Sequence, residues 1–251
     1  MTFEVAAPVL IFIALLASSF GALALYERLP RDWQHTETLD VIHAAARLFV
    51  IMTSLVLGFM MNSAKNTYEA HDHNIHAYAT QMILMDKTLQ RYGPDANDMR
   101  QRLRAFAERV ADAHVTGDPS AANDKQAEQL LTAVGNGLNA IMPSDPLHLE
   151  LWHDAQQQYQ KLVETRLSLI EQSQSNMPAP LIVMLGAWLM LIFTSFGYRA
   201  PRNPVVAGTM IAAAALVSGA LYLILDMGQP YSGPIQVSSE PLERVIAELG
   251  R

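Results

Sequence analysis

The stretch VIHAAARLFVIMTSLVLGFMM, residues 41–61, decides how this chain folds. It contains one residue with a fixed charge, Arg47, among side chains that are mostly apolar. A run of about twenty such residues is long enough for an α-helix to cross the hydrocarbon core of a bilayer. The stretch therefore predicts a transmembrane helix, and it raises the question of why that helix contains an arginine.

Three further runs in the chain have the same apolar character. They lie at 8–25, 181–197 and 205–225. Short loops join the four runs into two pairs, so the sequence predicts an all-α polytopic membrane protein with four transmembrane helices in two hairpins. The predicted parts are a first hairpin at 1–61, an extramembrane domain at 62–178, a second hairpin at 179–226 and a C-terminal Gly/Pro-rich segment with a short helix at 227–251.

The large insert between the hairpins has apolar residues at helical spacing and no hairpin turn signal between strand-like runs. Nothing interrupts the second span before Tyr92, Gly93 and Pro94, so we expect one long helix that leaves the membrane and continues to that point. Asp145 and Pro146 predict the cap and first turn of the last helix of the insert. We expect these helices to pack on the extension of the second span.

The composition argues against several classes of function. The chain has no cysteine, which removes disulfides, zinc–thiolate sites and cysteine nucleophiles. Its net charge of −7 argues against nucleic-acid binding. The sequence contains no Gly-rich phosphate loop, nucleophile elbow or paired-carboxylate motif. We therefore expect neither an enzyme nor a bound cofactor.

The second span has a polar face. At 100° per residue, the following residues lie on one face roughly 100° wide, which we call the polar line: Arg47, Ile51, Ser54, Gly58 and Asn62. Ile51 is its apolar interruption at membrane depth. In one interpretation the line packs inside the four-helix bundle of one subunit, and Arg47 snorkels toward an acid such as Asp40.

In the other interpretation, several subunits direct the polar line to a common axis, where it lines an ion path. Ile51 would then form an apolar ring that gates by dewetting, and Arg47 would form a positive ring that favours anions. Ser54 and Asn62 would offer hydrogen bonds to a partly dehydrated ion.

Histidines and charged residues follow the second span. His71, His73 and His76 lack the i, i+4 spacing and third ligand of a metal site on a helix, so we predict no metal and interpret them as a solvated surface. The acids and arginines at 98–112 are interpreted in the same way, as an exposed face with i, i+4 pairs.

The stretch LDMGQPYSGPIQVSSEPLERVIAELG, residues 225–250, closes the chain. Asp226 stands at the C-terminal end of the fourth span, where the helix dipole disfavours a negative charge. This placement suggests a partner for its carboxylate, and the alternative is hydration at the membrane interface. Residues 238–249 predict a short helix with Pro241 in its first turn, whose apolar face docks on the insert or on a neighbouring subunit.

This tail resembles that of a bacterial membrane family called bestrophin-like. In that family an aspartate ends the fourth span and is followed by a proline, a glycine, I-x-V-S and P-L. The residues in register here are Asp226, Pro230, Gly233, Ile235, Val237, Ser238, Pro241 and Leu242. We treat Asp226, Pro230, Gly233 and Pro241 as a structural tail motif. Gly228 and Gln229 depart from the family pattern, which has an acid and an arginine just before the proline.

Bestrophins proper are pentameric ion channels whose second spans line the pore and whose neck is apolar. The resemblance therefore implies a homo-oligomer, a pentamer by analogy, that lies in the lipid bilayer of a bacterial plasma (inner) membrane and passes small ions. The alternative function is a membrane-anchored scaffold or sensor whose insert binds a partner. Arginines in the short loops place the insert outside by the positive-inside rule, whereas the resemblance implies a cytoplasmic insert.

Overall fold

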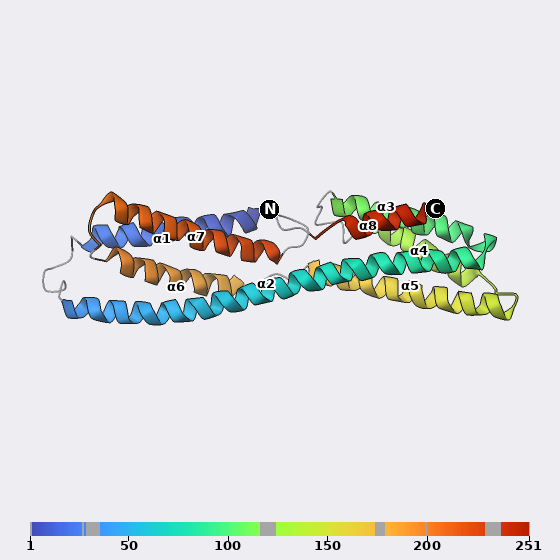
Figure 1. Cartoon of the computed structure of the whole chain (residues 1–251), viewed down its shortest axis with the longest axis horizontal. Helices are drawn as coiled ribbons and strands as arrows, with labels where there is room; N and C mark the ends of the chain where they lie inside the picture. Colours follow the sequence, from blue (N-terminus) through green and yellow to red (C-terminus); the bar gives the residue numbers. More distant parts are fainter. Residues whose placement is uncertain are drawn as a thin grey trace. The chain divides into compact units, whose positions relative to one another are not determined.

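The computed structural model of the chain describes residues 2–26, 28, 36–115, 124–173, 179–198, 200–228 and 237–250. Over these residues all of the regular structure is helical, as the sequence predicts (Figure 1). The α-helices are α1 (Thr2–Tyr26), α2 (Thr36–Tyr92), α3 (Asn97–Val115), α4 (Lys125–Ala140), α5 (Pro146–Ser173), α6 (Ala179–Gly197), α7 (Pro204–Met227) and α8 (Glu240–Leu249). A short 3-10 turn, η2 (Pro94–Ala96), precedes α3. The four helices that are long and apolar enough to cross a membrane, α1, α2, α6 and α7, contain the four predicted spans.

The helices form two compact units, each with its own apolar core. The membrane unit comprises Met1–Asn66 and Asn176–Gly228, and the insert unit comprises Thr67–Ser175 and Gln229–Arg251. Helix α2 is continuous over 57 residues and contributes its N-terminal part to the first unit and its C-terminal part to the second.

Helix α2 ends where the sequence predicts. Gly93 has a φ of 103°, in the left-handed region that costs glycine little, and its N–H donates to the Leu89 carbonyl at 3.3 Å. Pro94 follows and has no N–H with which to extend the helical hydrogen bonding. The expected continuation of the second span to Tyr92 is confirmed.

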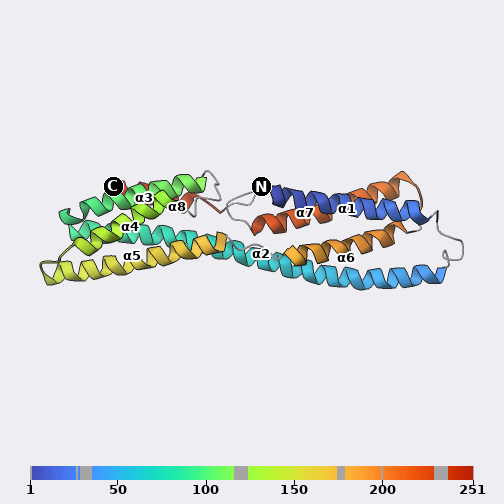
Figure 2. The same cartoon turned by 180° about the vertical axis from the view of Figure 1, so that it is seen from behind.

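In the membrane unit, α1 packs against both α6 and α7 (Figures 1 and 2). Leu15 of α1, Leu185 of α6 and Leu221 of α7 are at most 1% exposed and lie in one core. Met60 and Ala64 of α2 belong to the same core. Helix α2 therefore contributes one face to this core, and most of its residues on the other faces are exposed.

In the insert unit, one core contains residues from α2, α3, α4, α5 and α8. Phe106 of α3 is fully buried at its centre. Polar contacts add to this packing: the Arg100 guanidinium of α3 binds the Asp86 carboxylate of α2 through two bonds of 2.8 and 3.1 Å. The Trp152 indole N–H donates to the Leu138 carbonyl at 2.8 Å and so satisfies a carbonyl near the end of α4. The expected helical character of the insert is confirmed.

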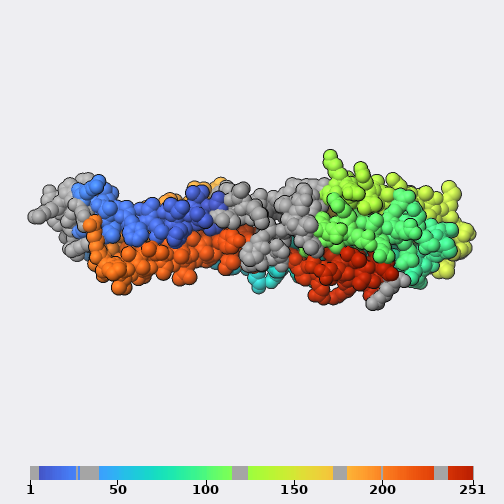
Figure 3. Space-filling view, turned by 90° about the horizontal axis from the view of Figure 1, so that it is seen from above, coloured from blue at the N-terminus to red at the C-terminus, as the bar shows by residue number. Residues whose placement is uncertain are grey.

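The last helix, α8, packs against α3 within the insert unit, as the red and green surfaces of Figure 3 show. Its buried residues are Pro241, Leu242, Val245 and Leu249. Of the two expected docking partners for this helix, the insert of the same chain is therefore the one found. Pro241 lies in the first turn, also as expected.

The exposed charges of α3 agree only in part with the sequence interpretation. Arg102 pairs with Asp98 at 2.8 Å and Arg104 pairs with Glu108 at 2.9 Å, both at i, i+4 spacing. Arg109 instead pairs with Asp124, which lies just before α4. The expectation of purely local pairs was wrong for Arg109, because helix packing brings the start of α4 within its reach.

Candidate functional site

Helix α2 has a buried face in the membrane unit. Ala46, Thr53, Met60 and Ala64 are 8%, 5%, 2% and 1% exposed, and they recur at spacings of seven or four residues. This repeat is the signature of one helix face held against a core. At 100° per residue the polar line is centred about 135° around the helix from this buried face.

The structure gathers the five predicted residues on the exposed side of α2. Arg47, Ser54, Gly58 and Asn62 are exposed, and Ile51 is 61% exposed. Together they extend over about 22 Å of helix axis. The interpretation in which the polar line packs inside the bundle of one subunit is therefore wrong, because the core of the membrane unit uses the other face of α2.

Local contacts along the polar line are sparse. The Ser54 hydroxyl donates to the Val50 carbonyl of its own helix at 2.8 Å. A Cβ placed on Gly58 would meet nothing within 4 Å. Within the described part of the chain, Arg47 forms no ion pair, so the expected pairing with Asp40 is not present. The line thus presents a cation, hydrogen-bonding groups and one apolar side chain to its surroundings.

Large apolar side chains border the polar line on one side. Leu48, Leu55 and Phe59 are 63%, 69% and 67% exposed. Such a strip on a helix of transmembrane length is covered by lipid or by protein. At 100° per residue all three lie on the same side of the polar line, which is therefore bordered by an exposed apolar strip.

The sequence pattern described as Bestrophin-like domain matches residues 12–242. The chain belongs to the bestrophin-like family. This confirms the resemblance seen in the tail, and together with four apolar helices it identifies a membrane protein. A comparison with curated proteins finds no match.

Solved structures share the fold of this bestrophin-like chain. Two crystal structures of variants of a bacterial bestrophin homologue from Klebsiella pneumoniae have TM-scores of 0.70 and 0.68, at 11% and 10% sequence identity. Both comparisons cover 96% of this chain and 97% of that chain. At such low identity the likeness establishes the fold alone.

The tail motif of the bestrophin-like chain is only partly described. Asp226 is 1% exposed near the end of α7, so the alternative of a hydrated carboxylate at the interface is wrong. Pro230 and Gly233 lie outside the described residues. Pro241 is buried in the first turn of α8. Asp226 and Pro241 thus belong to different units.

The histidines after the second span differ from one another. His71 is fully buried, whereas His73 and His76 are exposed. The interpretation of all three as solvated was wrong for His71, which lies on the face of α2 that packs inward. Among the described residues no group of three potential ligands could hold a metal ion, so the three histidines are not gathered into a site.

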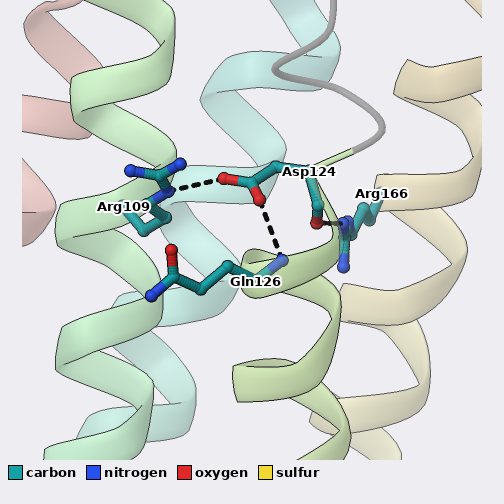
Figure 4. A network of polar contacts seen from close by, with 4 residues as sticks. All are labelled: Arg109, Asp124, Gln126 and Arg166. Atoms are coloured by element: carbon teal, nitrogen blue, oxygen red, sulfur yellow. Dashed lines mark hydrogen bonds and ion pairs between the residues drawn. The ribbon is translucent and has the colours of Figure 1, made fainter.

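A polar network at the start of α4 was missed from sequence (Figure 4). The Asp124 carboxylate caps α4 by accepting the Gln126 N–H at 2.8 Å, and it also accepts from the Arg109 guanidinium. The Arg166 guanidinium donates to the Asp124 carbonyl at 3.1 Å. The hydrogen bond from Arg109, followed by backbone N–H donors, lowers the pKa of the Asp124 carboxyl. An aspartate directly before an apolar helical run is the signal that could have predicted this cap.

Proposed function

We propose that this bestrophin-like chain assembles into a homo-oligomeric ion channel whose path is lined by the polar line of α2. The observation that supports the proposal is the exposure of that line, which lies away from the face that α2 buries in the membrane unit. Four helices of one subunit do not enclose an aqueous path around it. Several copies arranged about an axis do, with each copy contributing one α2.

The position of Arg47 favours a water-filled surrounding. Arg47 lies four residues before Ile51, the midpoint of the apolar run, and thus about 6 Å from it along the helix axis. A charged side chain at the centre of a membrane helix costs about 2.5–3.5 kcal/mol on insertion scales. A hydrated path reduces that cost, and a ring of guanidinium groups attracts anions. We therefore propose that the path favours anions.

Ile51 is proposed as the constriction. It is the residue of the polar line with an apolar side chain, and it lies between Arg47 and Ser54. A narrow ring of apolar side chains excludes water and thereby blocks ions. Ser54 and Asn62 would contact ions on the far side of this ring, with Gly58 leaving room between them.

The apolar strip beside the polar line provides a surface for assembly. Leu48, Leu55 and Phe59 lie beside the polar line, where neighbouring copies of α2 would meet around an axis. The family resemblance favours five subunits and a bacterial plasma membrane location. The proposed environment is therefore lipid on the outside of the assembly and permeant small ions along its axis.

Cysteine accessibility tests this proposal, because the chain has no native cysteine. The proposal predicts that a charged, membrane-impermeant thiol reagent modifies a Ser54→Cys variant in liposomes and changes its ion flux. The matched control is Thr53→Cys, one residue earlier on the buried face, which should be neither modified nor blocked. Equal reactivity of the two positions, or no flux from any variant, would support the scaffold or sensor alternative instead.

A further inference from the structure

A small cavity lies within the insert unit, where α2, α3, α4, α5 and α8 converge. Its volume is about 50 Å³. The side chains that matter for its chemistry are Tyr78, Val110, His114, Ala127, Arg166 and Leu242. The walls are mostly apolar, and none of the lining residues is an acid.

Arg166 gives the cavity a fixed positive charge. Its guanidinium has five N–H donors. One of its nitrogens donates to the Asp124 carbonyl at 3.1 Å, and its central carbon lies 5.9 Å from the centre of the Phe106 ring. The Asp124 carboxylate itself is bound by Arg109 and by the first turn of α4 (Figure 4). Within the described residues Arg166 therefore forms no ion pair. The Asp124 carboxylate does not neutralise its charge, although the Asp124 carbonyl accepts its hydrogen bond.

His114 is the second polar group of the wall. Its Nε2 lies 3.2 Å from the Val237 carbonyl, and because a carbonyl only accepts, Nε2 carries the proton. Burial lowers the pKa of His114, with the Val237 contact opposing that shift. The imidazole is therefore neutral near pH 7, and Arg166 supplies the charge of the cavity.

We propose that this cavity binds a small monocarboxylate, whose carboxylate lies on the Arg166 guanidinium and whose short apolar body lies against Val110 and Leu242. The planar guanidinium matches a carboxylate through two parallel hydrogen bonds. One water needs about 10–15 Å³ of cavity volume measured in this way, so the cavity has room for about three to five waters. That is the size of acetate or propionate, and it excludes long acyl chains. Apolar walls favour such an anion over a bare halide, which has no carbon to bury. This site does not depend on the proposed ion path.

The test is a ligand-observed NMR titration of the purified full-length protein with propionate. The wild type should bind propionate saturably, and Arg166→Gln should weaken binding at least about tenfold, because a charge-assisted hydrogen bond is lost. Arg102→Gln is the matched control: it removes an exposed arginine from α3 and should leave binding unchanged. Propionamide, which has the same shape without the charge, should not bind.

A second variant keeps Arg166 in place. Val110→Phe fills the cavity with a larger side chain and should abolish propionate binding, while thermal denaturation checks that both variants stay folded. The proposal is overturned if wild type, Arg166→Gln and Val110→Phe bind propionate equally. It is also overturned if propionamide binds as tightly as propionate, or if chloride competes at the same concentration as propionate. The comparison of propionate with propionamide uses wild-type protein alone, so it tests whether the cavity selects a carboxylate even if a variant fails to fold.

Discussion

The α-carbon of Gly197 on α6 faces the backbone carbonyl of Ser19 on α1, with no room for a side-chain carbon between them. A Cβ built on Gly197 would also lie 3.1 Å from the Cβ of Ala22. Small residues let the backbones of membrane helices approach this closely, and van der Waals packing then holds them together. The glycine is therefore a packing requirement of the membrane unit.

We predict that Gly197→Ala destabilises the membrane unit by about 1–3 kcal/mol, because the added methyl forces the backbones of α1 and α6 apart. The measurement is the thermal denaturation midpoint of the protein in detergent. Gly208→Ala on α7 is the matched control, since a Cβ there meets nothing within 4 Å, and it should leave the midpoint unchanged or slightly raised. Equal effects of the two substitutions would contradict the packing role.

The Asp86–Arg100 pair gives a second prediction. Asp86→Asn should lower the free energy of unfolding by about 1–3 kcal/mol, since it leaves a largely buried guanidinium without its carboxylate. Asp98→Asn removes the carboxylate of the exposed Arg102 pair and should cost less than about 0.5 kcal/mol. Chemical denaturation of both variants checks the difference. A loss of similar size in both would show that the buried pair contributes no more than a surface pair.

Much of this fold follows from the length of the apolar runs and from the helical spacing of apolar residues. The four spans, the long α2 and the docked tail helix were all predicted, because each depends on local pattern and on stop signals such as Gly93-Pro94. The exposure of the polar line could not be predicted. Periodicity places Arg47 and Asn62 on one face, but only packing decides whether that face meets a core.

The features that sequence reasoning missed depend on contacts between distant segments. Arg109 and Asp124 are fifteen residues apart, and the fold of α3 against α4 brings them together. His71 has a polar side chain on a helix with many exposed charges, yet it faces inward. The cavity beside Arg166 is lined by residues of five helices, so it cannot be predicted from any single segment of the sequence.

His114 predicts a pH dependence of stability. A base whose folded pKa lies below its unfolded value of about 6.5 binds fewer protons when folded, so stability falls as the pH drops below that value. We expect the free-energy difference between wild type and His114→Gln to shrink as the pH falls from about 7.5 to about 5.5. Urea titrations at several pH values measure it. A difference that stays constant or grows toward acid would contradict the assignment.

Arg47 predicts the sign of ion selectivity. Arg47→Glu reverses the charge of the proposed ring, so the reversal potential in a salt gradient should shift from the anion toward the cation equilibrium potential. Arg47→Gln removes the charge without reversing it and should give an intermediate value. An unchanged reversal potential in both variants would place Arg47 outside the ion path.

The conductance of Ile51→Ser in planar bilayers tests the central claim most directly. A serine at the proposed constriction lets water enter the ring, so the account predicts a larger current than wild type at the same voltage and salt. Thr53→Ser, on the buried face of α2, is the control and should conduct like wild type. Wild type and Ile51→Ser that are both silent, or that conduct equally, would contradict an ion path along the polar line of α2.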